Sequence, residues 1–581
     1  MKKRFWFLFL AGLLSGFIIS QNFETINSAD VRSAQKILNL KFGDAEIDTL
    51  LSYLEDNRKS YDSMRSFPLG NEIEPAVSFD PYPIDFLIQP SKGLNKWEVD
   101  ENVKLPKDKE SIAFLSIMEL AGLIKSKQIS SLELTELYLE RIKKYDPKLL
   151  AVITVTEDLA LEQARRADAE IANGNYKGPL HGLPYGLKDL ASVPGYRTTW
   201  GAAPYKDQVI NETATVAKKL EEAGAVLIGK MVSGSLARGD VWFGGKTKNP
   251  WDLTQGATGS SAGSASATSA GLVAFSIGTE TLGSIISPST RCGVTGLRPT
   301  FGAVSRSGFM TLSWSMDKVG PICRNATDCA IVFDYIKGQD KADRSVQDAA
   351  FDYQAAVNLK DLKVGYFFSQ FDSDTTANRI HNERTLAEFR KMGINPEKVA
   401  IPDGYPFKVF DIILRAESGA FFDELLLSGR DSLMVEQHKE SRANSLRQSR
   451  FIPAVEYLQA NRHRRLLIEE MQDLIEKYDV IISPTFGGRQ MLITNLTGHP
   501  ALSLPNGFDE KGRPTSITLV GNYFGEGKLI ALAEAYQKKF SYHGKVPKEV
   551  KLKLLEKVLS PELKALWYDA KGDRKLALEL P

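Results

Sequence analysis

Three polar residues that can carry out nucleophilic chemistry lie among small residues in the chain. Ser260 follows Gly259 in a run of serine, alanine and glycine, and Ser284 ends a second glycine-containing segment 24 residues later. Lys188, the first residue of a Lys-Asp pair, lies further upstream. Two serines and a lysine can supply a nucleophile, a proton relay and a base, which together suit amide-bond hydrolysis. No other part of the sequence restricts the possible functions of the chain as strongly.

The segment that precedes Ser284 predicts how this serine is presented. The apolar run 272–277 predicts a buried strand, and Gly278 and Gly283 then bracket a tight loop that ends at Ser284. A nucleophile beside free backbone N–H groups can use them as an oxyanion hole, which is often the largest single contribution to catalysis. A glycine-rich turn without a catalytic role is the alternative that this loop, taken alone, leaves open.

Four motifs in a fixed order give the chain a family resemblance. They are Gly178-Pro179-Leu180-His181-Gly182-Leu183-Pro184 with Lys188-Asp189, Gly259-Ser260-Ser261-Ala262-Gly263, Gly278-Thr279-Glu280-Thr281-Leu282-Gly283-Ser284, and Cys292-Gly293-Val294-Thr295-Gly296-Leu297-Arg298-Pro299-Thr300. Asp317-x-x-Gly320-Pro321 follows them. Their order and spacing resemble the amidase signature family of serine hydrolases, over roughly residues 111–545.

The resemblance implies a role for each of the polar residues. Ser284 corresponds to the nucleophile, Ser260 to the bridging serine, which in the family lies on a cis peptide bond, and Lys188 to the base. The implied oxyanion donors are the backbone N–H groups of Thr281, Leu282, Gly283 and Ser284. Lys188 must be neutral to accept a proton, which a buried site favours. The resemblance also implies an α/β/α sandwich around a central mixed β-sheet, and no cofactor.

The chain departs from the family pattern near the nucleophile. The family often has Asp at Glu280, Gly at Leu282 and Arg at Ile286. A leucine adopts a positive φ only at a cost in free energy, whereas glycine does not. The leucine at position 282 could therefore change how many backbone N–H groups point at the oxyanion. Arg291 is our candidate to replace the missing arginine.

Two local patterns offer rival interpretations. Gly259–Gly263 also fits a Gly-x-Ser-x-Gly nucleophile elbow, which would make Ser261 the nucleophile. Such an elbow must follow a buried strand, whereas the residues before Gly259 are typical of a loop. His181 is an alternative base, although we expect it to be structural.

Composition and charge limit the other functions. The chain has 581 residues, 43% apolar and 25% charged, with a net charge of +1, which is typical of a globular protein and does not suggest a nucleic-acid partner. Six histidines and three cysteines show none of the usual metal-ligand spacings. We therefore expect a metal-free site acting on a small-molecule amide, and the chain can form a homodimer.

The first twenty residues indicate export. Lys2, Lys3 and Arg4 precede an uncharged run that ends at Ser20, which predicts a signal peptide over residues 1–20. The run of about 16 residues is shorter than the roughly 20 that span a bilayer, so we expect a periplasmic or extracellular protein without stable membrane insertion. Export permits a disulfide between Cys323 and Cys329, but we expect three free thiols.

The rest of the chain divides into three parts. A helical and proline-punctuated amino-terminal arm is predicted for residues 21–105, the catalytic domain for 106–545 and a tail for 546–581. Capping boxes at Ser116 and Ser130 predict helices, and alternating apolar strands and helices predict an α/β fold. The strands are expected at 149–153, 225–228, 272–277, 362–368, 480–483 and 515–520, and further helices at 156–172, 458–477 and 525–540.

These observations favour an exported amidase with a Ser-Ser-Lys triad. The alternative is the glutaminase component of an aspartyl/glutamyl-tRNA amidotransferase, which the resemblance also covers. That component works in the cytosol with a partner, so the predicted signal and arm argue against it. A catalytically inactive binding module is disfavoured because all three triad positions are filled.

Overall fold

The computed structural model describes residues 25–67, 73, 75–353, 358–376 and 378–547, and it separates into two compact units. The first unit ends at Ile73 and the second begins at Glu74. The predicted signal peptide and nearly all of the predicted tail lie outside the described residues. Within the described part, no helix is both long and apolar enough to cross a membrane.

The described part of the first unit contains a pair of helices, as the periodicity of the arm predicts. They are α2 (Ser28–Leu38) and α3 (Asp44–Arg65). The Asn27 side chain caps α2 by accepting from the Ala29 N–H, and Asn39 ends it in the left-handed conformation (φ 53°). Val31 and Ile47 are buried, one on each helix.

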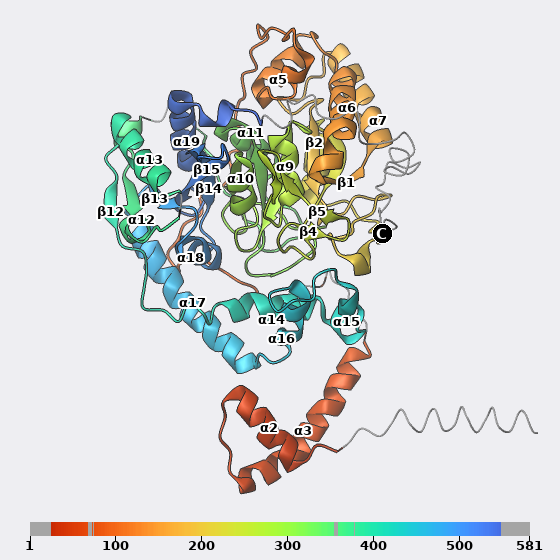
Figure 1. The fold of residues 1–581 in the computed structure, drawn as a ribbon, viewed down its shortest axis with the longest axis vertical. Helices are drawn as coiled ribbons and strands as arrows, with labels where there is room; N and C mark the ends of the chain where they lie inside the picture. Colours follow the sequence, from red (N-terminus) through yellow and green to blue (C-terminus); the bar gives the residue numbers. More distant parts are fainter. Residues whose placement is uncertain (1–24, 68–72, 74, 354–357, 377, 548–581) are drawn as a thin grey trace, which may run out of the picture. The chain divides into compact units, whose positions relative to one another are not determined.

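The second unit is built on a mixed sheet of eleven strands (Figure 1). In spatial order they are β1 (Val152–Val155), β3 (Val226–Met231), β2 (Pro184–Lys188), β8 (Phe275–Glu280), β10 (Lys318–Cys323), β9 (Thr295–Arg298), β14 (Ala501–Phe508), β15 (Pro514–Gly521), β13 (Val480–Pro484), β11 (Val364–Phe367) and β12 (Glu397–Val399). β2 pairs in parallel with β3 and β8, whereas β8 pairs antiparallel with β10. The central strands are buried throughout, so helices must cover both faces.

Helices form the outer layers of this α/β/α sandwich (Figure 1). α9 (Ala262–Ser269) and α10 (Ile286–Cys292) pack against each other and against the sheet, and so do α8 (Thr215–Glu222), α11 (Ala326–Ile336) and α19 (Glu526–Phe540). The other helices are α4 (Lys109–Ile112), α5 (Ile117–Lys125), α6 (Ser131–Leu149), α7 (Glu157–Ala172), α12 (Phe368–Asp372), α13 (Arg379–Lys391), α14 (Asp411–Phe421), α15 (Asp423–Leu427), α16 (Arg442–Ser449), α17 (Ala454–Ile475) and α18 (Gln490–Thr497). The predicted fold class is confirmed.

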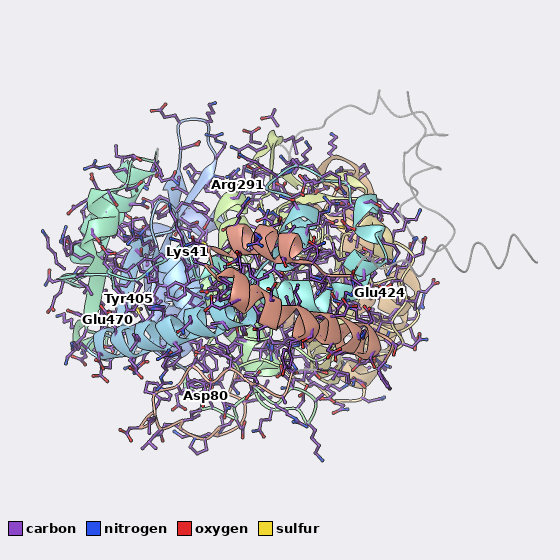
Figure 2. All side chains as sticks on the ribbon, turned by 90° about the horizontal axis from the view of Figure 1, so that it is seen from below. Lys41, Asp80, Arg291, Tyr405, Glu424 and Glu470 are labelled. Atoms are coloured by element: carbon purple, nitrogen blue, oxygen red, sulfur yellow. The ribbon has the colours of Figure 1, made fainter. Side chains whose placement is uncertain are left out.

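Helices α14, α15 and α16 lie below the middle of the sheet domain in the view of Figure 1, and α17 runs from them toward the sheet edge that carries β12. Tyr405 donates a 2.6 Å hydrogen bond to Glu470 on α17, and Figure 2 shows the two side by side. Apolar residues of these helices, such as Phe421 and Leu446, form a buried cluster with Met310 and Trp200 of the sheet domain. This cluster lies behind the candidate site described below.

The proline-punctuated segment belongs to the second unit from residue 74 onward. Tyr82 donates a hydrogen bond of 2.7 Å to the Phe301 carbonyl, and Pro90 forms a bridge with Ala349. The Asn95 N–H donates to Asp334 at 2.8 Å. These contacts hold the segment against the sheet domain as an extended arm.

Capping motifs in the sequence predict the starts of two helices correctly, but the strand that leads to Ser284 is predicted with the wrong bounds. The predicted capping boxes at Ser116 and Ser130 start α5 and α6. The strand expected at 272–277 is wrong in its bounds, because β8 runs from Phe275 to Glu280. The Leu272 N–H still bonds to Ala267 of α9, and pairing with β10 continues as far as Glu280. Gly278 therefore lies inside the strand rather than in the loop.

Candidate active site

Lys188 ends strand β2 and is completely buried. Its Nζ lies 2.9 Å from Ser260 Oγ, 3.0 Å from Ser261 Oγ and 2.8 Å from Thr279 Oγ1. Burial lowers the pKa of Lys188 from 10.5 to about 7, although the negative charges of Asp317 and Glu280 oppose the shift. An amine with a pKa near neutrality can both accept and return a proton at neutral pH.

Asp189, the neighbour of Lys188 in the Lys-Asp pair, is not its partner. Asp189 pairs with Lys230 at 2.8 Å, and both side chains are completely buried. Its carboxylate also accepts from the Thr199 N–H at 2.9 Å. Because its charge is neutralised by Lys230, Asp189 fixes the end of β2 without holding Lys188 in the charged form.

Ser260 lies directly before α9, and its peptide bond with Gly259 is cis. This is the conformation that the family resemblance implies. The Ser260 carbonyl accepts from the Gly234 N–H at 3.1 Å, while its hydroxyl faces Lys188. Ser260 is therefore placed where it can pass a proton to the lysine amine.

The Ser261 hydroxyl is engaged in hydrogen bonds that connect Lys188 with strand β8. Its hydroxyl contacts Lys188, donates to the Thr279 carbonyl at 3.0 Å and accepts from the Thr279 N–H at 3.1 Å. The strand before it, β7 (Asp252–Gly256), belongs to a separate two-stranded sheet, so no strand of the central sheet leads into this turn. The nucleophile-elbow interpretation of Ser261 therefore lacks its structural context.

Ser284 lies beside this cluster and is linked to it through the backbone. Its carbonyl accepts from the Ser261 N–H at 3.1 Å, and the residue is 7% exposed. Among the described residues the Ser284 hydroxyl has no hydrogen-bond partner, so its side chain is not bonded to Ser260 in this state. Catalytic hydrogen bonds of this kind often tighten only when substrate is bound.

The loop from Thr281 to Ser284 has the left-handed turn at Gly283 (φ 83°), while Leu282 keeps an ordinary negative φ. The departure at Leu282 therefore costs no backbone strain. In the described part of the chain, the N–H groups of Leu282, Gly283 and Ser284 are not used by any hydrogen bond of the loop. A Cβ at Gly283 would lie 2.6 Å from Met491 Sδ, so this position requires glycine.

Glu280 holds both ends of this loop. Its buried carboxylate accepts from the N–H groups of Ile285 at 2.8 Å and Ile286 at 2.9 Å, at the start of α10. Arg298 donates to it at 2.9 Å, and Asn495 donates at 2.8 Å. Although burial alone raises it, these partners leave the pKa of Glu280 below its usual value. Arg298 supplies the guanidinium that binds Glu280, and among the described residues no contact is seen between Arg291 and this carboxylate.

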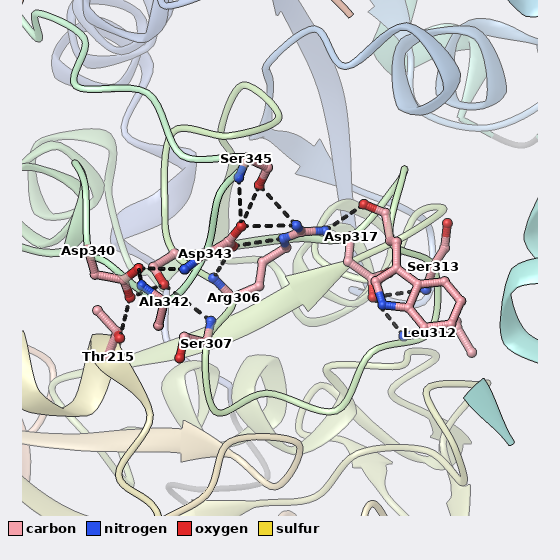
Figure 3. A network of polar contacts seen from close by, with 12 residues as sticks. Thr215, Arg306, Ser307, Leu312, Ser313, Asp317, Asp340, Ala342, Asp343 and Ser345 are labelled. Atoms are coloured by element: carbon pink, nitrogen blue, oxygen red, sulfur yellow. Dashed lines mark hydrogen bonds and ion pairs between the residues drawn. The ribbon is translucent and has the colours of Figure 1, made fainter. Parts of the chain in front are cut away.

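A second loop, residues 306–317, is fixed by three carboxylates. Arg306 binds Asp343 at 3.0 Å, as Figure 3 shows, and also donates to the Trp314 carbonyl at 2.6 Å. Asp317 accepts from the N–H groups of Leu312 at 2.7 Å and Ser313 at 3.0 Å (Figure 3). Glu417 on α14 accepts from the Ser315 hydroxyl at 2.7 Å. Asp317 also accepts from Thr281, which joins this loop to the nucleophile loop.

A small cavity of about 10 Å³ lies between the two loops. On one side it is lined by Thr279 and Thr281, next to Lys188 and the nucleophile loop. The opposite walls include Leu190, Phe309 and Met310.

The remaining predicted groups lie elsewhere or have other partners. His181 is buried in the segment before β2, with Nε2 3.0 Å from Glu170 and Nδ1 accepting from the Lys177 N–H, and it makes no contact with Lys188. The described residues contain no group of three or more His, Cys, Asp or Glu that could hold a metal ion. Cys292, Cys323 and Cys329 are buried free thiols.

Sequence reasoning missed two contributors to the site. Thr279 contacts Lys188 through its hydroxyl, and Arg298 binds Glu280. Both lie within the quoted motifs, which show their positions in the sequence but not their contacts.

The comparisons with known proteins agree with this arrangement. The family model described as Amidase matches residues 133–493. The chain belongs to the amidase signature family. A curated relative from Marinomonas sp., named as the A component of glutamyl-tRNA(Gln) amidotransferase, is 35% identical over 482 residues, 74% of this chain and 98% of that protein. A relative of the same name from Moorella thermoacetica is 33% identical over 491 residues, 75% of this chain and 98% of that protein.

A solved structure is similar to this amidase signature protein over most of its length. The native peptide amidase from Stenotrophomonas maltophilia has a TM-score of 0.65 and 27% identity, covering 73% of this chain and 97% of that one. The chain is therefore an amidase-type enzyme that acts on C–N amide bonds, and the comparisons leave its particular substrate open.

Proposed function

We propose that this chain hydrolyses a carboxylic amide through an acyl-enzyme on Ser284, with Ser260 as proton relay and Lys188 as base. The contact between Lys188 Nζ and Ser260 Oγ, at 2.9 Å and fully buried, carries the proposal. A lysine in this position can be neutral, because burial brings its pKa to about 7. A charged lysine could not take the proton that the attack releases.

The proposed reaction runs in two halves. Ser284 Oγ attacks the amide carbonyl carbon, its proton passes to Ser260, and the proton of Ser260 passes to Lys188. The backbone N–H groups of the loop, from Thr281 to Ser284, stabilise the oxyanion. The C–N bond then breaks, and the amine leaves with the proton returned through Ser260. Water repeats the sequence on the ester, which releases the carboxylic acid and restores Ser284.

Replacing the nucleophile tests this proposal. Ser284→Ala should lower kcat by on the order of 10³-fold or more, because the variant cannot form the ester. Circular dichroism and thermal unfolding of the same preparation should match the wild type, since the residue's side chain has no partner among the described residues. Near wild-type turnover by purified Ser284→Ala would overturn the assignment.

The second candidate is the glutaminase component of a tRNA-dependent amidotransferase. The names of the Marinomonas and Moorella relatives favour it over other amidases, and both are covered almost completely by this chain. In that case the substrate would be glutamine, and the ammonia would be used by a partner protein. Glutamine hydrolysis that rises only when an amidotransferase partner and tRNA are added would support this candidate.

The start of the chain bears on the same choice. The basic residues Lys2 to Arg4 and the uncharged run after them support an exported enzyme, which a cytosolic amidotransferase component would not be. Amino-terminal sequencing of the protein from its native host tests this point. A mature chain that begins near Gln21 supports export, and a cytosolic chain that retains Met1 contradicts it.

A further inference from the structure

Apolar side chains make up much of the lining of the cavity between the two loops, which also includes Arg306, Asp317 and Lys318. Leu190, Met310 and Leu312 are each 5% exposed or less, and Phe309 completes this wall. Behind Met310 lies the apolar cluster that contains Trp200, Phe421 and Met434. Deepening the cavity in this direction would therefore expose more apolar surface to a ligand and no charge.

The charged residues around the cavity are engaged with other parts of the chain. Arg306 is bound by Asp343 and by the Trp314 carbonyl (Figure 3). Asp317 accepts from Thr281 and from two backbone N–H groups. Ala237 also lines the cavity, and Arg442 donates to the carbonyls of Leu236 and Ala237. None of these side chains can turn to a ligand without breaking a buried contact.

Lys318, the remaining charged residue in the lining, also faces other parts of the chain. It lies opposite Glu280 in the pairing of β10 with β8, and its Nζ lies 3.5 Å from the Asn495 carbonyl. Burial lowers its pKa well below the usual value, and the neighbouring Arg298 adds to this effect. Lys318 is therefore buried next to Glu280 and the Asn495 carbonyl, and it would have to leave these neighbours to pair with a ligand carboxylate.

This arrangement discriminates between classes of amide. The α-ammonium and α-carboxylate of glutamine would each lose water in the cavity without gaining a partner, and burying an unpaired charge is costly. An aliphatic group meets apolar walls instead. The volume of about 10 Å³ limits such a group to about the size of one water molecule or methyl group.

The acyl part of the substrate is the part that this cavity suits. It stays bound through both halves of the reaction, whereas the amine must leave and be replaced by water. Leu282, 38% exposed, marks the side of the nucleophile loop that is open to solvent. The enclosed side, between Thr281 and Met310, is left for the acyl group.

We propose that this cavity is the acyl subsite, that it takes a short, uncharged, aliphatic acyl group, and that Met310 limits the length of that group. The proposal rests on the proposed amidase function. It predicts that acetamide, whose acyl group ends in a single methyl group, is hydrolysed in preference to propionamide and hexanamide, and that glutamine is a poor substrate. We choose Met310 as the specificity-determining residue because its long side chain lines the cavity and also belongs to the apolar cluster, as those of Leu190 and Leu312 do.

The test measures kcat/KM for acetamide, propionamide, hexanamide and glutamine with the full chain and two methionine variants. Met310→Ala should raise the ratio of hexanamide to acetamide by on the order of 10-fold or more, since a pocket discriminates about this strongly per methylene group. Met434→Ala is the matched control, because Met434 is buried in the same cluster but does not line the cavity. It should leave that ratio within about twofold of the wild type.

Three results would overturn the proposal. They are glutamine being hydrolysed faster than acetamide, Met434→Ala changing the ratio as much as Met310→Ala, and Met310→Ala leaving it unchanged. If no amide is turned over, titration calorimetry on Ser284→Ala keeps the subsite testable, and tighter binding of glutamine than of propionamide would contradict it. Failure of the proposed function is distinct, since it would appear as the absence of any acyl-enzyme with all four amides.

Discussion

Thr281 Oγ1 donates a hydrogen bond of 2.5 Å to Asp317 Oδ1, which ties the loop of the nucleophile to the loop that lines the substrate cavity. Asp317 also fixes the backbone of Leu312 and Ser313. One carboxylate therefore sets the distance between the oxyanion donors and the acyl subsite. Burial raises the pKa of Asp317, and the hydrogen bonds it accepts partly offset this.

Breaking this link should slow the chemical step more than it weakens substrate binding. Thr281→Val keeps the shape of the side chain but removes the donor, so the oxyanion groups lose their support. We expect kcat to fall by about 10-fold or more with a smaller change in KM, because misplacing one oxyanion donor costs up to 10²–10³. Thr281→Ser should restore most of the activity, and a wild-type kcat for Thr281→Val would contradict the account.

The activity should rise with pH through a limb near pH 7. Lys188 acts in its neutral form, and burial brings its pKa to about 7, so protonation below that pH removes the base. Profiles of kcat/KM against pH would show this limb in the wild type. Lys188→Arg, which keeps a permanent charge, should lose activity by on the order of 10²-fold or more.

His181 supplies the control for that profile. It has no contact with Lys188 and is held by Glu170 and Lys177. His181→Ala should retain most of the turnover and the same limb. An inactive but folded His181→Ala, together with an active Lys188→Arg, would show that the base is the imidazole.

Two neighbouring positions of the nucleophile loop should respond in opposite ways to alanine. Gly283→Ala should lower kcat by about 10-fold or more, because its left-handed φ of 83° and the close Met491 Sδ leave no room for a Cβ. Leu282→Ala should be nearly neutral in kcat, since Leu282 has an ordinary φ and is 38% exposed. Equal losses in the two variants would mean that the loop conformation is not what supports activity.

Chelation should leave the activity unchanged. The described residues contain no cluster of His, Cys, Asp and Glu able to hold an ion, and the proposed steps use only side chains and backbone. Assays before and after dialysis against EDTA check this. Loss of activity on dialysis, followed by recovery with a divalent ion, would rule out the mechanism in its present form.

Much of the fold could be predicted from local patterns, but several strands of the central sheet, such as β10 and β14, could not. The capping boxes of α5 and α6 are local signals, and the structure confirms both helices. Strand β10 contains Gly320 and Pro321, and β14 contains Pro505, which argue against strand by propensity. Packing on both faces of the sheet overrides those preferences, and no local window of sequence contains that information.

The residues of the candidate site could likewise be predicted only where they lie in local sequence motifs. Lys188, Ser260 and Ser284 were found because they lie in motifs with fixed spacing, and the structure brings Lys188 and Ser260 into contact. Arg298 and Asn495 hold the loop by donating to Glu280, and these residues come from elements far apart in sequence. The sequence alone could not show these contacts, and it suggested Arg291 instead. The apolar lining of the cavity likewise depends on tertiary packing around Met310.

The site of covalent modification tests the central claim most directly. Wild-type protein, Ser260→Ala and Ser284→Ala would be treated with a fluorophosphonate probe, digested and analysed by mass spectrometry. The account predicts one adduct, on the peptide that contains Ser284, with slower labelling of Ser260→Ala and none of Ser284→Ala. An adduct on Ser260 or Ser261, or equal labelling of Ser284→Ala, would contradict the proposed nucleophile and with it the triad.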